Sequence, residues 1–303
     1  MISVLIPIFN YNTTTLVASI HQQLELLPIN YEIICICDAS TNFLSENESI
    51  NCYSNTQLVS LKNNIGRSKI RNLLVEKSNY NWLLFIDADV FPESKLFIKT
   101  YLDLIKKYNT QVYCGGLIYK QEKPKREKVL RWVYGKKREE ISVKRRKERP
   151  YQFVTGANIL IHKTIFNSIK FNDIIVNYGY EDVVFIEDLK LNLIEVNHIK
   201  NPVFHLGIEN NLSFLNKTKE GLENLYFLNS KNILKGDNLK LVRTFRILKT
   251  LKLTWFVVLF FYTFEKLLEY NLLSGRPSIF LFDIYKIGYF STMYNAKKFK
   301  QDI

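Results

Sequence analysis

The chain lacks the residue spacings that build zinc and redox sites. Its four cysteines, Cys35, Cys37, Cys52 and Cys114, include no C-x-x-C pair, so neither a structural zinc site nor a thioredoxin-like centre is supported. Its four histidines include no H-x-x-x-H pair, which leaves a zinc hydrolase unsupported. We interpret the cysteines as core thiols of a protein in a reducing compartment.

Long apolar runs are also missing. The N-terminal segment MISVLIPIFNYN has no basic start and reaches polar residues too early for a signal peptide. The apolar run 253–264 is shorter than the ~20 residues that a membrane span needs. We therefore expect a cytoplasmic protein.

Positive charge, by contrast, is in excess. The net charge of +13 and the pI near 9.4 predict an anionic partner, which could be nucleic acid, a membrane surface or a phosphorylated small molecule. Residues 123–149 hold thirteen Lys and Arg against four Glu, and so carry most of the excess. This basic segment is either a solvated helix or loop, or a surface for a diphosphate, a lipid-linked acceptor or an anionic membrane.

The first half of the chain alternates short β-rich runs with helical stretches. The β-rich runs are ISVLIPIF, YEIICIC, QLVSL, WLLFIDA and VYCGGLIY, and the helical stretches are TTTLVASIHQQLELL, GRSKIRNLLVEKS and SKLFIKTYLDLIKKY. This rhythm predicts an α/β fold with a mainly parallel central sheet flanked by helices. A length of 303 residues fits one elaborated domain of this class, or such a domain with an appendage.

The composition changes again after residue 240. Aromatic residues there alternate with cations, among them Lys249, Lys252, Lys266 and Arg276. The pattern predicts a C-terminal helical appendage over residues 241–303. Two interpretations stay open, an amphipathic segment lying on a membrane surface and a helix packed on the α/β core.

The stretch FIDADVFP, residues 85–92, is an apolar run that ends in Asp87 and Asp89. The run predicts a buried strand, and ligands of open α/β sheets bind beyond the carboxyl ends of strands. Carboxylate oxygens at that place suit Mg²⁺ or Mn²⁺. Taken alone, such a pair more often marks a solvated strand end followed by a Phe-Pro turn than a site.

Other short motifs fall where further strands end. PIFN and CDAS follow the first two predicted strands, and NNIGRSKIRNLL follows the third and opens a helix with Arg67 and Arg71 one turn apart. Two guanidinium groups at a helix start suit phosphate oxygens. Further on come TGAN and GYED, where Glu181 and Asp182 either serve a helix N-terminus or supply a general base. In VFHLG, His205 is either a core residue or a ligand of Mn²⁺.

Taken in order, PIFN, CDAS, NNIGRSKIRN, FIDAD, TGAN, GYED and VFHLG resemble the inverting glycosyltransferases of family two. The resemblance covers residues 1–210 and implies the GT-A fold, a Rossmann-like nucleotide-sugar-binding fold. On this basis we expect residues 1–240 to form the catalytic domain. We further hypothesise that the basic segment 123–149 closes over the diphosphate as a lid. One departure concerns base recognition, because Asp38 is followed by Ala39 and Ser40 where many members have a second acid.

The resemblance also assigns roles to residues. Asp182 is the implied catalytic base, with Glu181 beside it to contact the acceptor or share the role. Asp89, His205 and Asp87 are the implied ligands of Mn²⁺ or Mg²⁺, with Asp89 favoured over Asp87. The residues implied to bind the nucleotide sugar are Pro7, Phe9, Asn10, Asp38, Gly66, Arg71, Asp87, Gly156 and Asn158.

The implied activity is transfer of one sugar, with inversion, from a nucleotide-diphosphate sugar to a hydroxyl group. We expect a UDP-sugar donor and a glycan or lipid-linked acceptor, in cell-surface polysaccharide or glycan biosynthesis. The Q-x-x-R-W motif of processive synthases is missing, which favours single transfer over polymerisation. With the interfacial interpretation of residues 241–303, the enzyme would be peripheral on the cytoplasmic face of a membrane.

Two other classes stay open. Asp-nucleophile phosphatases and phosphotransferases also place D-x-D after a buried strand, but they usually carry Thr or Val where this chain has Phe91. A non-catalytic membrane- or nucleic-acid-binding protein would use the basic segment. That segment contains no zinc finger, RNA-binding motif or heptad repeat, so we expect no nucleic-acid partner.

Overall fold

The computed structural model describes residues 1–107, 112–236 and 238–301, with only the backbone for 295–301. It contains two compact units. The first unit comprises Met1–Lys120, Glu139–Val176 and Glu181–Gly207, and the second comprises Gln121–Arg138, Asn177–Tyr180 and Ile208–Ile303. This division differs from the predicted boundary at residue 240, because residues 208–240 group with the C-terminal helices.

The first unit is built on a seven-stranded sheet with the order β3-β2-β1-β4-β8-β6-β9. Only β8 runs antiparallel to its neighbours, so the predicted α/β fold with a mainly parallel sheet is confirmed. The strands are β1 (Ile2–Ile8), β2 (Tyr31–Cys37), β3 (Thr56–Ser60), β4 (Trp82–Ile86), β6 (Val112–Cys114), β8 (Asn158–His162) and β9 (Val196–His198).

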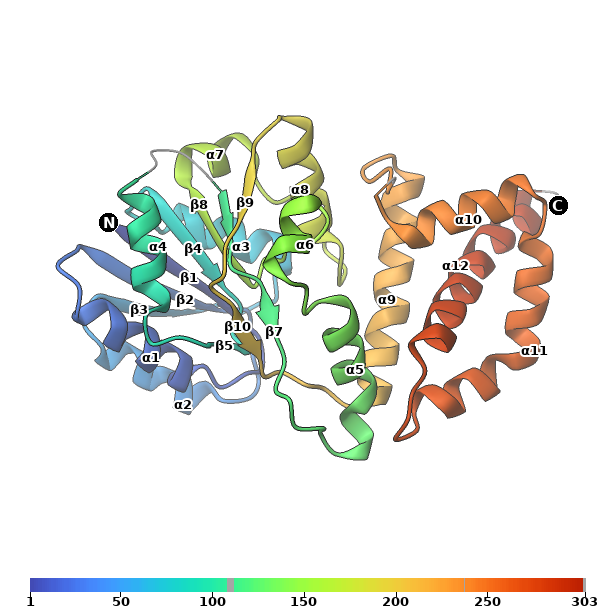
Figure 1. Ribbon diagram of the computed structural model, residues 1–303, viewed down its shortest axis with the longest axis horizontal. Helices are drawn as coiled ribbons and strands as arrows, with labels where there is room; N and C mark the ends of the chain where they lie inside the picture. Colours follow the sequence, from blue (N-terminus) through green and yellow to red (C-terminus); the bar gives the residue numbers. More distant parts are fainter. Residues whose placement is uncertain (108–111, 237, 302–303) are drawn as a thin grey trace. The chain divides into compact units, whose positions relative to one another are not determined.

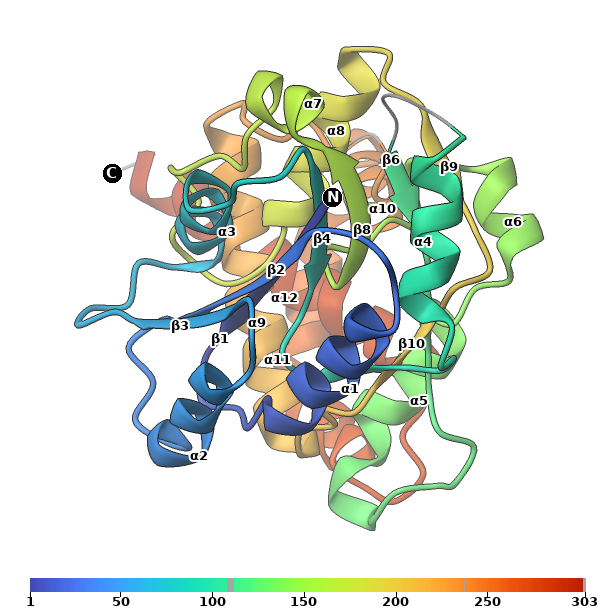
Figure 2. The ribbon, with the colours of Figure 1, turned by 90° about the vertical axis from the view of Figure 1, so that its left-hand side faces the viewer.

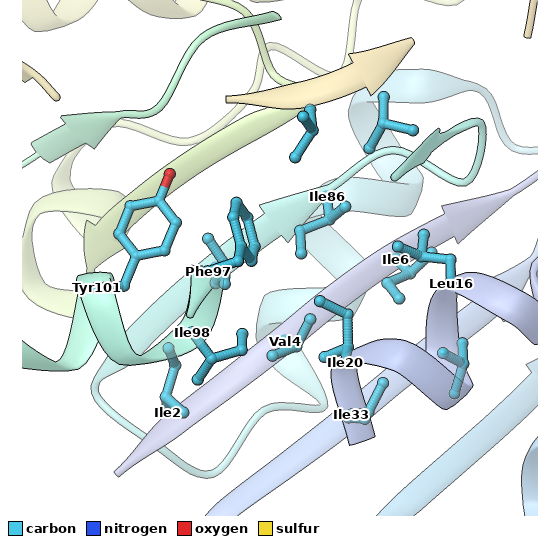
Figure 3. Packing of buried hydrophobic residues seen from close by; sticks show 14 of the residues in the cluster. Ile2, Val4, Ile6, Leu16, Ile20, Ile33, Ile86, Phe97, Ile98 and Tyr101 are labelled. Atoms are coloured by element: carbon cyan, nitrogen blue, oxygen red, sulfur yellow. The ribbon is translucent and has the colours of Figure 1, made fainter. Parts of the chain in front are cut away.

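Helices cover both faces of this sheet, because the central strands are apolar on both sides. Ile2, Val4 and Ile6 of β1 pack against α1 (Thr14–Glu25) and α4 (Phe97–Ile105), as Figure 3 shows. The intervening residue Leu5 belongs to a second cluster, with α3 (Arg67–Glu76), α7 (Lys163–Ser168) and α8 (Glu181–Leu191). Figure 2 shows α3 and α4 on opposite sides of the strands. The short α2 (Leu44–Glu48) and the 3-10 turn Ser49–Cys52 follow β2.

A second, three-stranded sheet in the first unit has the order β5-β10-β7. Its strands are β5 (Val90–Pro92), β7 (Leu117–Ile118) and β10 (Val203–His205). β5 and β10 pair antiparallel, which sets Val90 opposite His205. The predicted strand VYCGGLIY is therefore two strands in two sheets, β6 and β7, separated by Gly115 and Gly116.

The basic segment 123–149 is largely helical. It contains the 3-10 turn Arg126–Lys128, α5 (Val129–Arg138) and α6 (Val143–Glu148), and it is divided between the two units. Arg146 is buried in the first unit, where it donates hydrogen bonds to the carbonyls of Cys114 (3.0 Å), Gly115 (2.9 Å) and Ile199 (2.8 Å). Arg146 is thus a structural residue, and a lid role stays a prediction for the exposed cations of the segment.

The second unit is helical, which confirms a helical C-terminal region. Its main helices are α9 (Asn211–Ser230), α10 (Lys240–Thr250), α11 (Thr254–Leu272) and α12 (Ile279–Gln301), and α12 lies between α9 and α11 in Figure 1. Their core includes Leu215, Phe261, Leu268 and Phe282. Among the described residues no single helix has the length and hydropathy of a membrane span; only α10 and α11 together do, and they are bent by 117°.

Candidate active site

Several of the predicted site residues follow the carboxyl ends of parallel strands at one edge of the main sheet. Phe9 and Asn10 follow β1, Asp38 follows β2 and Asp87 follows β4. Because β2, β1 and β4 are parallel neighbours, these positions share an edge. Pro7 lies within β1, opposite Ile36, and the Phe9 ring is 56% exposed just beyond the strand.

Asp38 holds the turn that begins α3. Its carboxylate accepts hydrogen bonds from the backbone amides of Ile65 (2.7 Å) and Gly66 (3.1 Å). Gly66 has φ +85°, a conformation that favours glycine, and it precedes the first residue of α3. Asn10 braces the same edge, since its side-chain oxygen accepts from the backbone amides of Thr41 (2.8 Å) and Asn42 (3.1 Å).

Arg71 of α3 is a buried hub that joins two motifs far apart in the sequence. Its side chain is 3% exposed. The guanidinium donates to Asp87 Oδ1 at 2.7 Å and lies 3.5 Å from Glu181 Oε1. Gly156 lies against the same guanidinium, where a Cβ atom would be 3.4 Å away. The D-x-D motif and the Glu-Asp motif therefore belong to one site.

Glu181, the first residue of α8, is buried and ion-paired. Its Oε1 also lies 3.2 Å from the Arg67 guanidinium, while its buried Oε2 has no hydrogen-bond partner. A buried carboxylate oxygen without a donor is costly unless a ligand group completes it. This oxygen is therefore open to a hydrogen-bond donor from a ligand.

Asp182 is partly buried beside Glu181. Burial of the carboxyl, followed by the negative charge of Glu181, raises the pKa of Asp182 to about 6, while Arg67 and Arg71 act in the opposite direction. A carboxylate with this pKa is a stronger base than an ordinary aspartate and is still ionised at neutral pH. Asp182 is thus electrostatically suited to accept a proton.

Asp89 and His205 form the second part of the site. Their Oδ2 and Nε2 atoms lie 3.5 Å apart, and the His205 ring is stacked on Tyr119 with centroids separated by 5.5 Å. A Cβ atom on Gly207 would lie 2.2 Å from Asp89 Oδ2, so this position requires glycine. A carboxylate and an imidazole oriented together fit a Mn²⁺ or Mg²⁺ ion whose other ligands are substrate oxygens or water.

The structure does not bring the three predicted metal ligands, Asp87, Asp89 and His205, together as one group. No group of three or more His, Cys, Asp and Glu side chains that could hold a metal occurs in the part of the chain that the structure describes. Asp87 instead pairs with Arg71, which leaves Asp89 and His205 as the candidate ligands.

Asn158 also differs from its predicted role. It is fully buried in β8, where its amide oxygen accepts from Tyr101 (2.6 Å) and its amide nitrogen donates to the carbonyls of Gly116 (3.1 Å) and Asn201 (2.9 Å). We therefore assign Asn158 to the fold and not to the set that contacts a ligand.

Three residues near the site were not among the predicted ones. Gly207 could have been found, because it stands two residues after His205 in VFHLG. Arg67 stands one helical turn before Arg71 and was considered for phosphate oxygens, whereas the structure pairs it with Glu181. Tyr119 carries no local signal, since its stacking on His205 depends on a strand pairing between distant segments.

Comparisons with known proteins agree with this arrangement. The family model described as Glycosyl transferase family 2 matches residues 3–170, more than half of the chain. No curated protein sequence matches the chain significantly. The family match favours glycosyl transfer over the phosphatase alternative for the D-x-D motif.

Two solved structures share the fold at low sequence identity. S. aureus TarS has 16% identity and a TM-score of 0.50, over 76% of this chain and 43% of that one. A mannosyltransferase from Pyrobaculum calidifontis, solved with GDP-Man and Mn²⁺, has 9% identity and a TM-score of 0.51, over 74% of this chain and 62% of that one. Our chain therefore spans less than two thirds of either protein. By its sequence match and its GT-A fold, the chain belongs to glycosyl transferase family 2.

Proposed function

We propose that this protein transfers a single sugar, with inversion, from a nucleotide-diphosphate sugar to a hydroxyl group of a glycan or lipid-linked acceptor. The observation that carries the proposal is the Arg71 hub, which joins Asp87 to Glu181, the neighbour of Asp182. Residues for donor binding and for proton transfer thereby come together in one unit.

Donor binding is assigned to the edge formed by β2, β1 and β4. Asp38, the Ile65–Gly66 turn and Asp87 would face the base and ribose, while Phe9 is exposed for stacking. Donors of this kind are bound by two neighbours of the same fold, since TarS has also been solved with UDP-GlcNAc and the mannosyltransferase with GDP-Man. We keep a UDP-sugar as the first donor to test.

Asp89 and His205 would hold a divalent ion, Mn²⁺ or Mg²⁺. When bound, such an ion offsets the negative charge that grows on the departing diphosphate. Gly207 allows the Asp89 carboxylate its position, and Tyr119 orients the His205 ring by stacking. The mannosyltransferase neighbour, solved with Mn²⁺, supports the choice of ion.

Proton transfer is assigned to Asp182. Its carboxylate takes the proton of the acceptor hydroxyl while that oxygen forms a bond to the anomeric carbon. The bond from this carbon to the diphosphate breaks, and the diphosphate leaves with the electron pair. A single displacement on the face opposite the leaving group inverts the configuration, and no covalent enzyme intermediate is formed.

Glu181 would position the acceptor. The buried Oε2 atom of Glu181, the residue before Asp182, has no hydrogen-bond partner. A second hydroxyl group of the acceptor substrate could donate a hydrogen bond to it. Arg67 and Arg71 hold the other oxygen, so the carboxylate is fixed before the acceptor arrives. This arrangement orients the attacking group without extra ordering in the transition state.

The proposal is tested by incubating the full chain with Mn²⁺ and UDP-, GDP- or TDP-linked sugars and measuring release of the nucleoside diphosphate. We expect turnover with one nucleotide class and loss of turnover with a chelator. NMR of the product with a model acceptor should then give the anomer opposite to that of the donor. Turnover of a generic phosphate ester without nucleotide-sugar cleavage would overturn the proposal.

A further inference from the structure

One face of α11 exposes large apolar side chains. Six of them, each between 54% and 77% exposed, make up what we call the α11 face: Trp255, Phe256, Leu259, Tyr262, Leu267 and Tyr270. The opposite side of the helix, with Phe261 and Leu268, is buried against the core of the second unit. So much exposed apolar surface on one helix indicates a binding surface.

The charges of α11 are segregated by side. Its two acids, Glu265 and Glu269, are turned toward α9, where they lie 3.9 Å and 3.0 Å from Lys219 Nζ. Lys266 is exposed and lies one helical turn from both Tyr262 and Tyr270. The outward side of the helix therefore presents apolar groups and positive charge, with Thr263 as an uncharged polar residue among them.

More positive charge lies at both ends of the helix. Lys252 is exposed in the turn before α11. Beyond its C-terminal end, Lys123, Arg126 and Arg276 line a hollow of about 580 Å³ together with Gly275. Lys123 Nζ donates to the Gly275 carbonyl at 3.1 Å, which fixes one wall of the hollow. Three cations around a hollow suit a phosphate group.

These charges favour one kind of binding partner for the α11 face over the others. A second copy of the chain would cover Lys266, which lies within the α11 face, with apolar groups, and burying that charge without a partner is unfavourable. An anionic phospholipid surface accepts both the apolar groups and the lysines. In membrane proteins, tyrosine, tryptophan and lysine side chains are also commonly found at the level of the lipid headgroups.

We propose that the second unit docks on an anionic phospholipid surface, with α11 lying in the interface plane and the hollow at Lys123, Arg126 and Arg276 taking a headgroup phosphate. The helix lies on the membrane and does not cross it, in the manner of interfacial amphipathic helices. This binding needs neither donor nor metal, so it stands or falls separately from the proposed transfer reaction.

The test is co-sedimentation of the full chain with phosphatidylcholine vesicles that contain or lack phosphatidylglycerol. We expect binding to the anionic vesicles only, with a blue shift of tryptophan fluorescence. Trp255→Ser should weaken binding ~10-fold or more through loss of buried aromatic area. Trp255→Phe should keep the binding and lose most of the shift, which identifies Trp255 as the residue that enters the lipid.

Charge variants separate the lysines from the hollow. Lys266→Glu and Arg276→Glu should each weaken binding ~5-fold or more, because each basic residue near an anionic surface contributes measurably. Lys200→Glu, an exposed lysine of the first unit, is the matched control and should bind as the wild type does. Equal binding to both vesicle types, no binding at low salt, or a dimer in solution that Trp255→Ser dissociates would each overturn the proposal.

Discussion

Each unit contains one cation that holds two carboxylates, and the two cations differ in burial. Arg71 in the first unit, 3% exposed, joins Asp87 and Glu181. Lys219 in the second unit, 27% exposed, joins Glu265 and Glu269. The arginine fork fixes two directions at once, whereas the lysine ammonium is a point charge on a flexible stem.

The two cation centres serve different ends. Next to Arg71, Glu181 is buried and Asp87 is 20% exposed, and the buried Oε2 of Glu181 has no hydrogen-bond partner, which is typical of a ligand-binding site. The carboxylates of Glu265 and Glu269 turn toward Lys219, so their negative charge does not lie on the exposed side of α11. In our proposals, buried charge marks the site of sugar transfer, and exposed apolar surface marks the surface that docks on a membrane.

The largest effect should come from Arg71→Met. It leaves Asp87 and Glu181 without their shared partner, and breaking a buried ion pair costs ~3–5 kcal/mol of unfolding free energy. Arg67→Met is the matched control, because Arg67 pairs with the same Glu181 but its side chain is 46% exposed. That change should cost ~1 kcal/mol or less. Urea denaturation measures both, and equal losses would contradict the buried hub.

Asp89→Asn should lower the affinity for Mn²⁺ in the presence of UDP on the order of 100-fold, since it removes the charged ligand of the candidate metal site. Asp103→Asn is the control, because its carboxylate pairs with Lys99 on the surface of α4 at 2.9 Å. Calorimetric titration with Mn²⁺ measures the affinity. Unchanged binding by Asp89→Asn would remove this residue from the metal site.

The pH profile tests the state of Asp182. Because its pKa is raised to about 6, the carboxyl is protonated below that pH and cannot accept a proton. We expect kcat/KM to rise with pH through about 6, with activity ~10-fold lower one pH unit below that value than on the plateau. Glu181→Gln should move this limb to lower pH, because Glu181 is one cause of the raised pKa. A limb that stays in place would implicate another group.

Lys219→Met should have the smallest effect. A partly exposed lysine with two carboxylate partners contributes ~1 kcal/mol or less to stability. The change should also leave sugar transfer unaltered, because Lys219 belongs to the second unit. Urea denaturation and the transfer assay check the two statements. A loss as large as that of Arg71→Met would end the distinction between the two centres.

Most of the fold was predictable from apolar runs. β1, β2, β3, β4 and the helices α1 and α3 have the length and pattern that a sequence reveals. The three-residue strands β5 and β9 were not predictable, because they are too short for a period. β5 forms by pairing of residues 90–92 with residues 203–205 of β10.

The site was predictable as a set of residues but not as a geometry. Strand ends identified Asp38, Asp87 and Asp89, since an apolar run that ends in a carboxylate is a local signal. Arg71 and Glu181 are far apart in the sequence, so the local sequence around neither residue predicts their contact. Asn158 was misassigned because a Gly-Ala-Asn turn and the first residue of a buried strand have the same local sequence.

The central claim, that Asp182 is the base of a glycosyl transfer, is tested most directly by Asp182→Asn. The amide keeps the size of the side chain and cannot take a proton, so transfer should fall ~10²–10⁴-fold while calorimetric affinity for the nucleotide-sugar donor stays unchanged. Transfer within a few-fold of the wild-type rate would contradict the account and would mean that another carboxylate accepts the proton.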